Sequence, residues 1–269
     1  MAPHSGLRSS WRLAAYLGWT FLCLPVQIVA VRFPGPFRVW FPRFYHGVCT
    51  RLLGLEVTVV GKQASPGPVL YVSNHSSYLD IMVLGAVIPG SFIAKTEVGA
   101  WPLFGTLARL QRTVFVSRSR NRSVIRERDG IQSRLEAGDN LILFPEGTTS
   151  DGNRVLPFKS AFLAVAESVP GRTVTVQPVS IAAASLDGIP LGRLLRPVYA
   201  WYADMTLPGH LPKVPGYGKI RVVVEFHPPV TPDTFGDRKA LTEYCWKEVA
   251  GGVARAVTGR PDTHAAVVS

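Results

Sequence analysis

Residues 69–80 read VLYVSNHSSYLD, a short apolar run followed by a polar turn and the start of a second apolar run. The first four residues suit a buried strand, and residues 79–87 have helical spacing until Pro89 and Gly90 end them. A buried strand that passes directly into a helix is typical of α/β sheets. We therefore predict a strand, a polar connection carrying His75, and a helix.

The same alternation continues to the end of the chain. Strands are expected over 55–60, 91–94, 113–116, 141–144, 174–181 and 220–226, and helices over 101–109, 123–137, 158–168 and 238–257. Residues 186–218 are rich in Gly and Pro and should pass over a sheet edge. The pattern predicts an α/β fold: a central mixed, largely parallel sheet flanked by helices, in one domain over 55–260, with a loose tail over 261–269.

The N-terminal segment, residues 1–54, has a different composition. Residues 13–31 are almost wholly apolar and are flanked by Arg12 and Arg32. A helix of about 19 residues just spans a hydrocarbon core. A cleaved signal peptide and a buried soluble helix are the alternatives, but the run is long for a signal peptide and no small-residue cleavage site follows it. A membrane anchor is the favoured interpretation.

Residues 33–53 mix aromatic side chains with arginines, as an interfacial helix requires. Together with 13–31 they form either a span or a helical hairpin that dips into one leaflet. The flanking arginines predict that the following domain lies on the cytoplasmic side. The whole chain is therefore expected to have an N-terminal membrane-associated helical segment.

The net charge of +11 allows three partners: nucleic acid, an anionic membrane surface or an acidic substrate. The basic residues are spread among apolar stretches, and no recognition helix or stacking-aromatic pattern is present, which favours the membrane surface over nucleic acid. Cys23, Cys49 and Cys245 are scattered and lie at no zinc-ligand spacing, so we expect free thiols and no metal site.

Polar side chains follow the strands at 69–72, 113–116 and 141–144. His75 and Asp80 are five residues apart across a turn, so the carboxylate can hold one ring nitrogen and leave the other as a base. Arg118 and Glu146 come just past the next two strand ends. Each residue alone has an ordinary explanation, a chance pair or a solvated loop residue, but together they predict a site at one crevice.

These motifs resemble the glycerolipid acyltransferases related to bacterial 1-acylglycerol-3-phosphate acyltransferase. NHSSYLD is similar to their NHxSxxD block, VFVSR to their second block, FPEGTTS to their FPEGT block and QPVS to their fourth. The order and spacing match over residues 55–185. His-x4-Asp alone is a weak signal, but followed some seventy residues later by FPEGT it is strong.

The resemblance implies a role for each matching residue. His75 would be the general base that deprotonates the acceptor hydroxyl, and Asp80 would orient it. The substrate-binding residues would be Arg118, Glu146, Gly147, Thr148, Lys159 and, more weakly, Lys95. No serine sits in a Gly-x-Ser-x-Gly elbow, so we expect direct attack on a thioester, with backbone amides near His75 stabilising the oxyanion.

The expected reaction moves a fatty acyl group from acyl-CoA or acyl carrier protein to the sn-2 hydroxyl of lysophosphatidic acid, without metal or cofactor. Ser117 and Thr149 depart from the common blocks, where aspartate and arginine are usual, so the acceptor headgroup stays open. A lyso-ornithine lipid or another lysophospholipid is the alternative acceptor, and a membrane-anchored lipid-binding protein the non-enzyme alternative. The resemblance implies the bacterial inner membrane.

Overall fold

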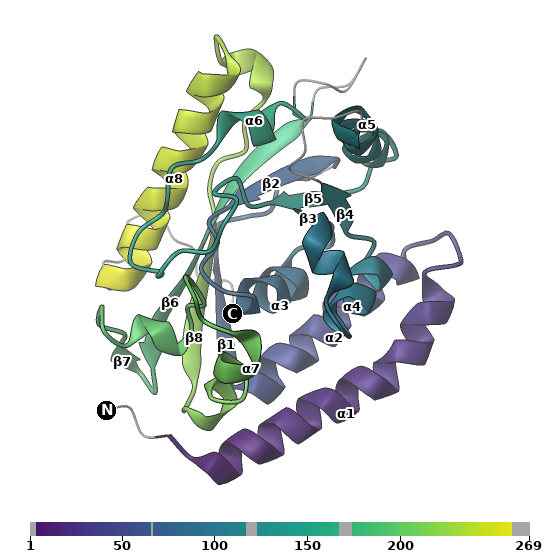
Figure 1. Cartoon of the computed structure of the whole chain (residues 1–269). Helices are drawn as coiled ribbons and strands as arrows, with labels where there is room; N and C mark the ends of the chain where they lie inside the picture. Colours follow the sequence, from purple (N-terminus) through teal and green to yellow (C-terminus); the bar gives the residue numbers. More distant parts are fainter. Residues whose placement is uncertain (1–3, 66, 117–122, 167–173, 260–269) are drawn as a thin grey trace.

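The computed structural model describes residues 4–65, 67–116, 123–166 and 174–259. Within this part an eight-stranded sheet has the order β1-β8-β6-β2-β5-β3-β4, with β7 paired to β6 (Figure 1). The strands are β1 (Leu55–Val60), β2 (Val69–Ser73), β3 (Ser91–Lys95), β4 (Val114–Val116), β5 (Leu141–Leu143), β6 (Thr175–Leu186), β7 (Ile189–Pro190) and β8 (Ile220–Phe226). The helices are α1 (Gly6–Ala30), α2 (Phe37–Leu53), α3 (Leu79–Val87), α4 (Phe104–Leu110), α5 (Ser123–Glu136), α6 (Ser160–Leu163), α7 (Leu207–His210) and α8 (Arg238–Thr258).

The sheet is mixed but largely parallel, as predicted. Strand β6 runs antiparallel to β8 and to β7, whereas β1 pairs with β8, and β2, β5, β3 and β4 pair in turn, in parallel. Because β2, β5 and β3 are parallel neighbours, their carboxyl ends meet at one edge of the sheet. The residues that follow these strands are therefore brought together.

The two faces of the sheet bury different side chains of the same strands. Val69 and Tyr71 of β2 belong to a cluster with α2 and α3, whereas Leu70 and Val72 belong to a cluster with α5 and α8. This alternation is the period of two that a strand imposes on its side chains. Figure 1 accordingly shows α8 on one face and α3, α2 and α1 stacked on the other.

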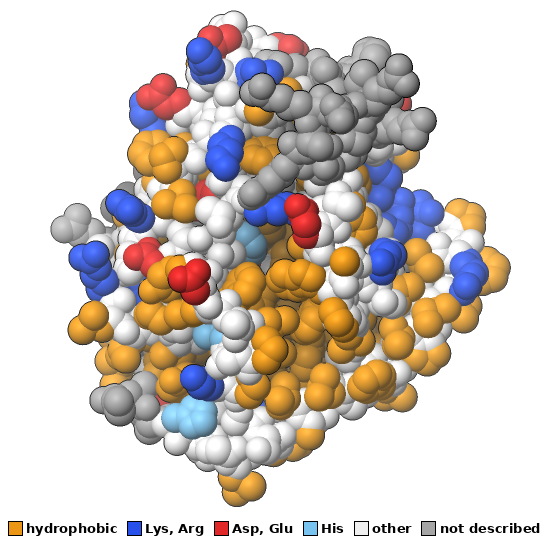
Figure 2. All heavy atoms as spheres, viewed as in Figure 1, with side chains coloured by type: hydrophobic (Ala, Val, Ile, Leu, Met, Phe, Trp, Pro, Cys, Tyr) orange, Lys and Arg blue, Asp and Glu red, His pale blue; other side chains and the backbone are white. Residues whose placement is uncertain are grey.

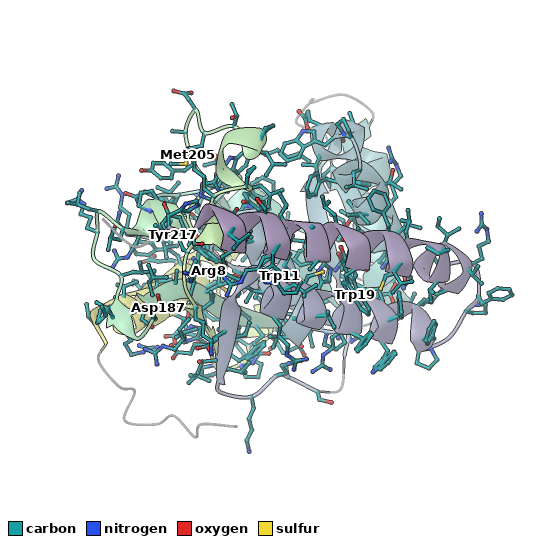
Figure 3. The ribbon with its side chains drawn as sticks, turned by 90° about the horizontal axis from the view of Figure 1, so that it is seen from below. Arg8, Trp11, Trp19, Asp187, Met205 and Tyr217 are labelled. Carbon is teal, nitrogen blue, oxygen red and sulfur yellow. The ribbon has the colours of Figure 1, made fainter. Side chains whose placement is uncertain are left out.

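Helices α1 and α2 form an antiparallel hairpin that packs on α3, and Figure 3 shows α1 lying across the molecule from below. The buried residues of α1 recur at helical spacing and include Tyr16, Thr20, Cys23 and Gln27. The opposite side exposes large apolar side chains: Leu7, Trp11, Phe21, Leu22, Val26 and Val29. In the described chain, α1 is the one helix long and apolar enough to cross a membrane.

Some expected elements differ from the observed ones. The interfacial helix expected over 33–53 begins only at Phe37, and Pro42 lies inside α2 without interrupting it. The helix expected over 158–168 is short, since α6 ends at Leu163, and residues 167–173 lie outside the described residues. The tail 261–269 also lies outside them. The segment 186–218 is not plain loop, because it contains β7, α7 and three-residue 3-10 turns at Arg196–Val198 and Val214–Gly216.

Asn74 fixes the end of β2 against β6. Its side-chain amide donates to the carbonyl of Ile181 at 2.9 Å, and its Oδ1 accepts from the Ile181 N–H at 2.9 Å. The side chain is buried, so both bonds are made away from water. This pair of bonds sets where β2 stops and hence where His75 begins the connection.

We expect Asn74→Ala to destabilise the protein by about 1–3 kcal/mol, because the buried N–H and C=O of Ile181 lose their partners. Thermal unfolding in detergent measures the effect as a lower Tm. Asn74→Asp keeps an acceptor for the Ile181 N–H but loses the donor and buries a charge against the Ile181 carbonyl, so it should not recover the wild-type Tm. Equal Tm values for wild type and Asn74→Ala would contradict the assignment.

Candidate active site

His75 and Asp80 form a hydrogen-bonded pair at the carboxyl end of β2. His75 Nδ1 lies 2.9 Å from Oδ2 of Asp80, whose side chain is fully buried. Because a carboxylate only accepts, Nδ1 carries a proton, so in the neutral imidazole it is Nε2 that keeps a lone pair. Among the described residues, no protein group bonds Nε2, and the ring is 19% exposed. The imidazole is thus held as a base that faces outward.

The connection itself supplies further donors to Asp80. Oδ2 also accepts the backbone N–H groups of Ser76 at 2.7 Å and Ser77 at 2.9 Å. Oδ1 accepts the phenol of Tyr199 at 2.7 Å. Burial, followed by the charge of Asp80, raises the pKa of Tyr199 well above its ordinary value, which keeps the phenol protonated and donating. Four donors offset the cost of burying the carboxylate.

Sequence reasoning missed Tyr199, which lies 119 positions from Asp80 along the chain. The sequence offers only an indirect signal: Tyr199 is one of the aromatic residues in the Gly- and Pro-rich segment 186–218. The segment is tied to the site a second time, because Trp201 N–H donates to the carbonyl of Ser76 at 2.7 Å. The excursion over the sheet therefore completes the active site.

The residues after β5 support His75 from its other side. The Phe144 ring stacks on the His75 ring with centroids 4.1 Å apart and an angle of 15°. Glu146 Oε1 accepts the His75 N–H at 2.7 Å, and Oε2 accepts the Leu156 N–H at 3.0 Å. Ser150 N–H donates to the His75 carbonyl at 2.9 Å. The FPEGT segment thus holds the backbone of His75.

Glu146 is buried, and its carboxyl group carries unusual electrostatics. The pKa of Glu146 is raised to about 8: burial raises it most, the two backbone N–H bonds lower it, and the nearby Asp80 adds a smaller increase. Both oxygens are engaged by the protein in this structure. Glu146 therefore has a positioning contact to His75, and its predicted contact with substrate stays a prediction.

The other predicted binding residues are distributed around this edge. Gly147 has φ 68°, and a Cβ built there would lie 3.2 Å from Lys159 Nζ. The absence of a side chain therefore lets the Gly147 backbone approach the Lys159 amine. Thr148 is exposed on the same loop, and Lys95 ends β3 half-buried. Arg118 lies outside the described residues. The structure brings Gly147 and Lys159 together on the FPEGT segment that holds the His75 backbone, and their contact with substrate stays a prediction.

One expectation about the oxyanion is wrong for the nearest amides. The N–H of His75 is bound to Glu146, and those of Ser76 and Ser77 are bound to Asp80. An engaged amide cannot also stabilise a developing negative charge, so donors must come from elsewhere. The sequence did not reveal this, because the Asp80 carboxylate accepts hydrogen bonds from the amides of Ser76 and Ser77 in the turn that precedes it.

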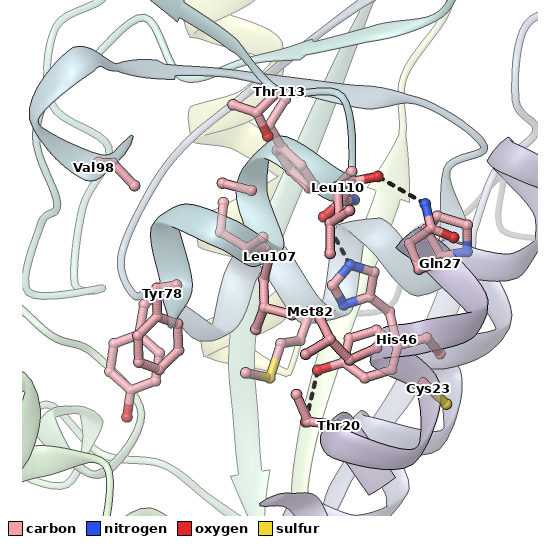
Figure 4. A pocket seen from close by; sticks show the side chains of 18 of the residues that line it. Thr20, Cys23, Gln27, His46, Tyr78, Met82, Val98, Leu107, Leu110 and Thr113 are labelled. Carbon is pink, nitrogen blue, oxygen red and sulfur yellow. Dashed lines mark hydrogen bonds between the residues drawn. The ribbon is translucent and has the colours of Figure 1, made fainter. Parts of the chain in front are cut away.

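An apolar cavity of about 170 Å³ lies next to the pair, between α1, α2, α3 and α4. Tyr78, which directly precedes α3, and Met82 of α3 line it, and so do Phe92 and Leu107 (Figure 4). Phe92 stacks on Phe144, the ring that stacks on His75. The cavity is therefore connected to the His75 ring through two stacked aromatic rings. Figure 2 shows hydrophobic side chains around the hollow on this face and below it.

Comparison with known proteins agrees with this geometry. The sequence model of the Acyltransferase family matches residues 56–182. A lyso-ornithine lipid O-acyltransferase of Brucella abortus is 41% identical over 92% of this chain and 94% of its own length. The chain belongs to the glycerolipid acyltransferase family.

Other members of the family bear different names. A 1-acyl-sn-glycerol-3-phosphate acyltransferase of Neisseria gonorrhoeae is 33% identical over 75% of each chain. The crystal structure of the 1-acyl-sn-glycerophosphate acyltransferase of Thermotoga maritima has a TM-score of 0.66 at 24% identity, covering 95% of this chain and 100% of that one, and shares its fold. Membership implies a lysolipid acceptor and an acyl donor, and with α1 it indicates membrane association.

Within the described residues, the cysteines of this glycerolipid acyltransferase form no disulfide and no metal cluster. The three cysteines, Cys23, Cys49 and Cys245, are buried free thiols, as expected. Within the described ranges, no group of three or more His, Cys, Asp or Glu side chains is arranged to hold a metal ion. The expectation that the reaction uses no cofactor stays a prediction.

Tyr199→Phe should lower kcat about tenfold with little change in KM, because it removes one bond to Asp80 without touching substrate. Steady-state kinetics with a lysolipid and an acyl thioester measures both constants. Tyr71→Phe is the matched control, since Tyr71 is equally buried, at 1% exposure, but packs against Phe226 instead. Similar losses in both variants would remove Tyr199 from the site.

Glu146→Gln should change how stability depends on pH. Between its ordinary pKa of 4.5 and about 8, the folded protein holds a proton at Glu146 that the unfolded chain has released, so wild-type stability falls as pH rises through this window. Glu146→Gln cannot titrate and should lack that part of the decline. Tm values across this window test it, and parallel curves for the two proteins would contradict the raised pKa.

Proposed function

We propose that this acyltransferase moves a fatty acyl group from acyl-CoA or acyl carrier protein to the hydroxyl of a lyso-ornithine lipid. The observation that carries the chemistry is His75 held through Nδ1 by Asp80, with Nε2 open. The acceptor is supported by relatives: four of them, at 34–41% identity, are named lyso-ornithine lipid O-acyltransferase. Lysophosphatidic acid is the second candidate, supported by the relatives of that name.

In the proposed reaction, His75 Nε2 removes the proton of the acceptor hydroxyl as its oxygen attacks the thioester carbonyl carbon. The imidazolium is stabilised by Asp80, whose charge it faces directly. The tetrahedral intermediate then expels the thiolate, which takes the proton back from Nε2. The ester and the free thiol are the products, so His75 is returned to its starting state without an acyl-enzyme.

The free backbone amides of the FPEGT loop are suited to the oxyanion. Thr148 and Thr149 follow Gly147, and within the described chain no group accepts a hydrogen bond from their N–H groups. The positive φ of Gly147 turns this loop beside the catalytic pair. We therefore propose that these amides donate to the oxyanion that develops on the thioester carbonyl, since the amides of residues 75–77 are occupied.

The apolar cavity fits the fatty chain of the donor. It is walled largely by apolar side chains and begins beside Phe92 and Tyr78, next to the catalytic pair. Its far wall is the α1–α2 hairpin, whose outer side exposes Trp11, Phe21 and Leu22. The flanking arginines favour the cytoplasmic face of a bacterial inner membrane as the location.

Purified full-length protein in detergent should acylate lyso-ornithine lipid from acyl-CoA or acyl carrier protein, with thiol release as the readout. His75→Ala should lower the rate by about 10²–10⁴-fold, the usual contribution of a catalytic base. Transfer to lysophosphatidic acid alone would show that the second acceptor is correct. Full activity of His75→Ala would exclude the mechanism.

A further inference from the structure

The loop directly after the FPEGTTS motif carries charged side chains beside the catalytic turn. Ser150 N–H bonds the His75 carbonyl, and Asp151, Gly152 and Asn153 follow it. A Cβ built on Gly152 would lie 3.8 Å from the Ser76 Cβ and 3.9 Å from the Arg196 Cδ. Gly152 therefore lies between the residue after His75 and an arginine from a distant part of the chain.

Arg196 is placed there by the same turn that carries Tyr199. The N–H groups of Tyr199 and Ala200 donate to the Arg196 carbonyl at 2.9 and 2.8 Å, and Tyr199 in turn bonds Asp80. Arg196 Nη1 donates to Oδ1 of Asn153, which fixes the guanidinium beside the loop. Sequence reasoning gave no role to Arg196, because it belongs to none of the family motifs.

The charge of Arg196 is not neutralised by a direct partner. Its Nε is buried without a hydrogen-bond partner, and among the described residues no carboxylate lies within 4.0 Å of the guanidinium. Burial lowers the pKa of Arg196, whereas the charge of Asp151 raises it, so the two groups sense each other without touching. Arg196 is thus a half-buried cation beside the active site, and Asp151 is a nearby anion that forms no ion pair with it.

We propose that Arg196 and Asp151 form the headgroup subsite of this acyltransferase and bind an acceptor that carries both an anionic group and an ammonium group. A guanidinium suits a carboxylate, and a carboxylate suits an ammonium. Ornithine joined to its lipid through one amine keeps a second amine and a carboxylate, which matches the pair. The inference rests on the proposed function and names what selects its acceptor.

Asp151 is the residue that distinguishes the two candidate acceptors. A phosphate carries only negative charge, so Arg196 attracts it and Asp151 repels it. A zwitterionic headgroup satisfies both side chains. The pKa of Asp151 is lowered from its ordinary value. Burial raises it, but the hydrogen bonds from Asn153 and the charges of Arg154 and Arg193 lower it by more. Asp151 thus stays ionised and available to an ammonium.

The test uses wild-type protein and two acceptors: lyso-ornithine lipid, and the same lipid with its free amine acetylated. Wild type should favour the free amine by about tenfold in kcat/KM, the effect of one charge-assisted hydrogen bond. Asp151→Asn should bring that ratio close to one, while keeping the acceptor oxygen that the Asn153 N–H uses at 2.9 Å. Arg196→Gln should lower kcat/KM for both lipids, since both keep the carboxylate.

Glu56→Gln is the matched control, because it removes the same charge on the edge strand β1, where Glu56 pairs with Lys219. Its ratio should equal that of wild type. Unchanged ratios in Asp151→Asn, or equal wild-type rates on both lipids, overturn the subsite and leave the acyl transfer intact. Absence of transfer to unmodified lyso-ornithine lipid, with transfer to lysophosphatidic acid, overturns the proposed acceptor and the subsite together.

Discussion

The buried carboxylate of Asp80 is the interaction on which the site depends. It has no exposed surface and is compensated by donors from His75, Ser76, Ser77 and Tyr199. Losing one donor leaves part of a buried charge unpaired, which is costly. This one carboxylate therefore fixes three features: the turn after β2, the tautomer of His75 and the position of the segment 186–218.

The sheet delivers this carboxylate where the substrates meet. Parallel pairing of β2 with β5 places the FPEGT loop against the His75 backbone, and Asn74 anchors the end of β2 to β6. On the other side, α3 carries Asp80 at its start and packs on the α1–α2 hairpin. The His75–Asp80 pair, the apolar cavity and the exposed apolar side of α1 therefore follow one another from the sheet outward.

The proposed headgroup subsite is physically separate from the proposed catalytic pair. In the proposed reaction, proton transfer needs only His75 and Asp80, the histidine and aspartate of the NHSSYLD segment. The two side chains of the proposed subsite come from irregular segments: Asp151 from the loop after FPEGTTS and Arg196 from a 3-10 turn. Loops of this kind change without disturbing a buried pair. One scaffold can therefore serve acceptors with different headgroups.

The sequence by itself determined the fold class, the order of most strands and helices, and the pairing of His75 with Asp80. These depend on local patterns: apolar periodicity, strand-ending turns and a five-residue spacing across one turn. Only the tertiary structure decided that Tyr199 completes the pair, that Glu146 holds the His75 backbone, and that the amides of residues 75–77 are occupied. Those contacts join segments about 70 to 120 positions apart or depend on the exact path of a turn, and no local pattern records which distant side chain fills a buried hydrogen bond.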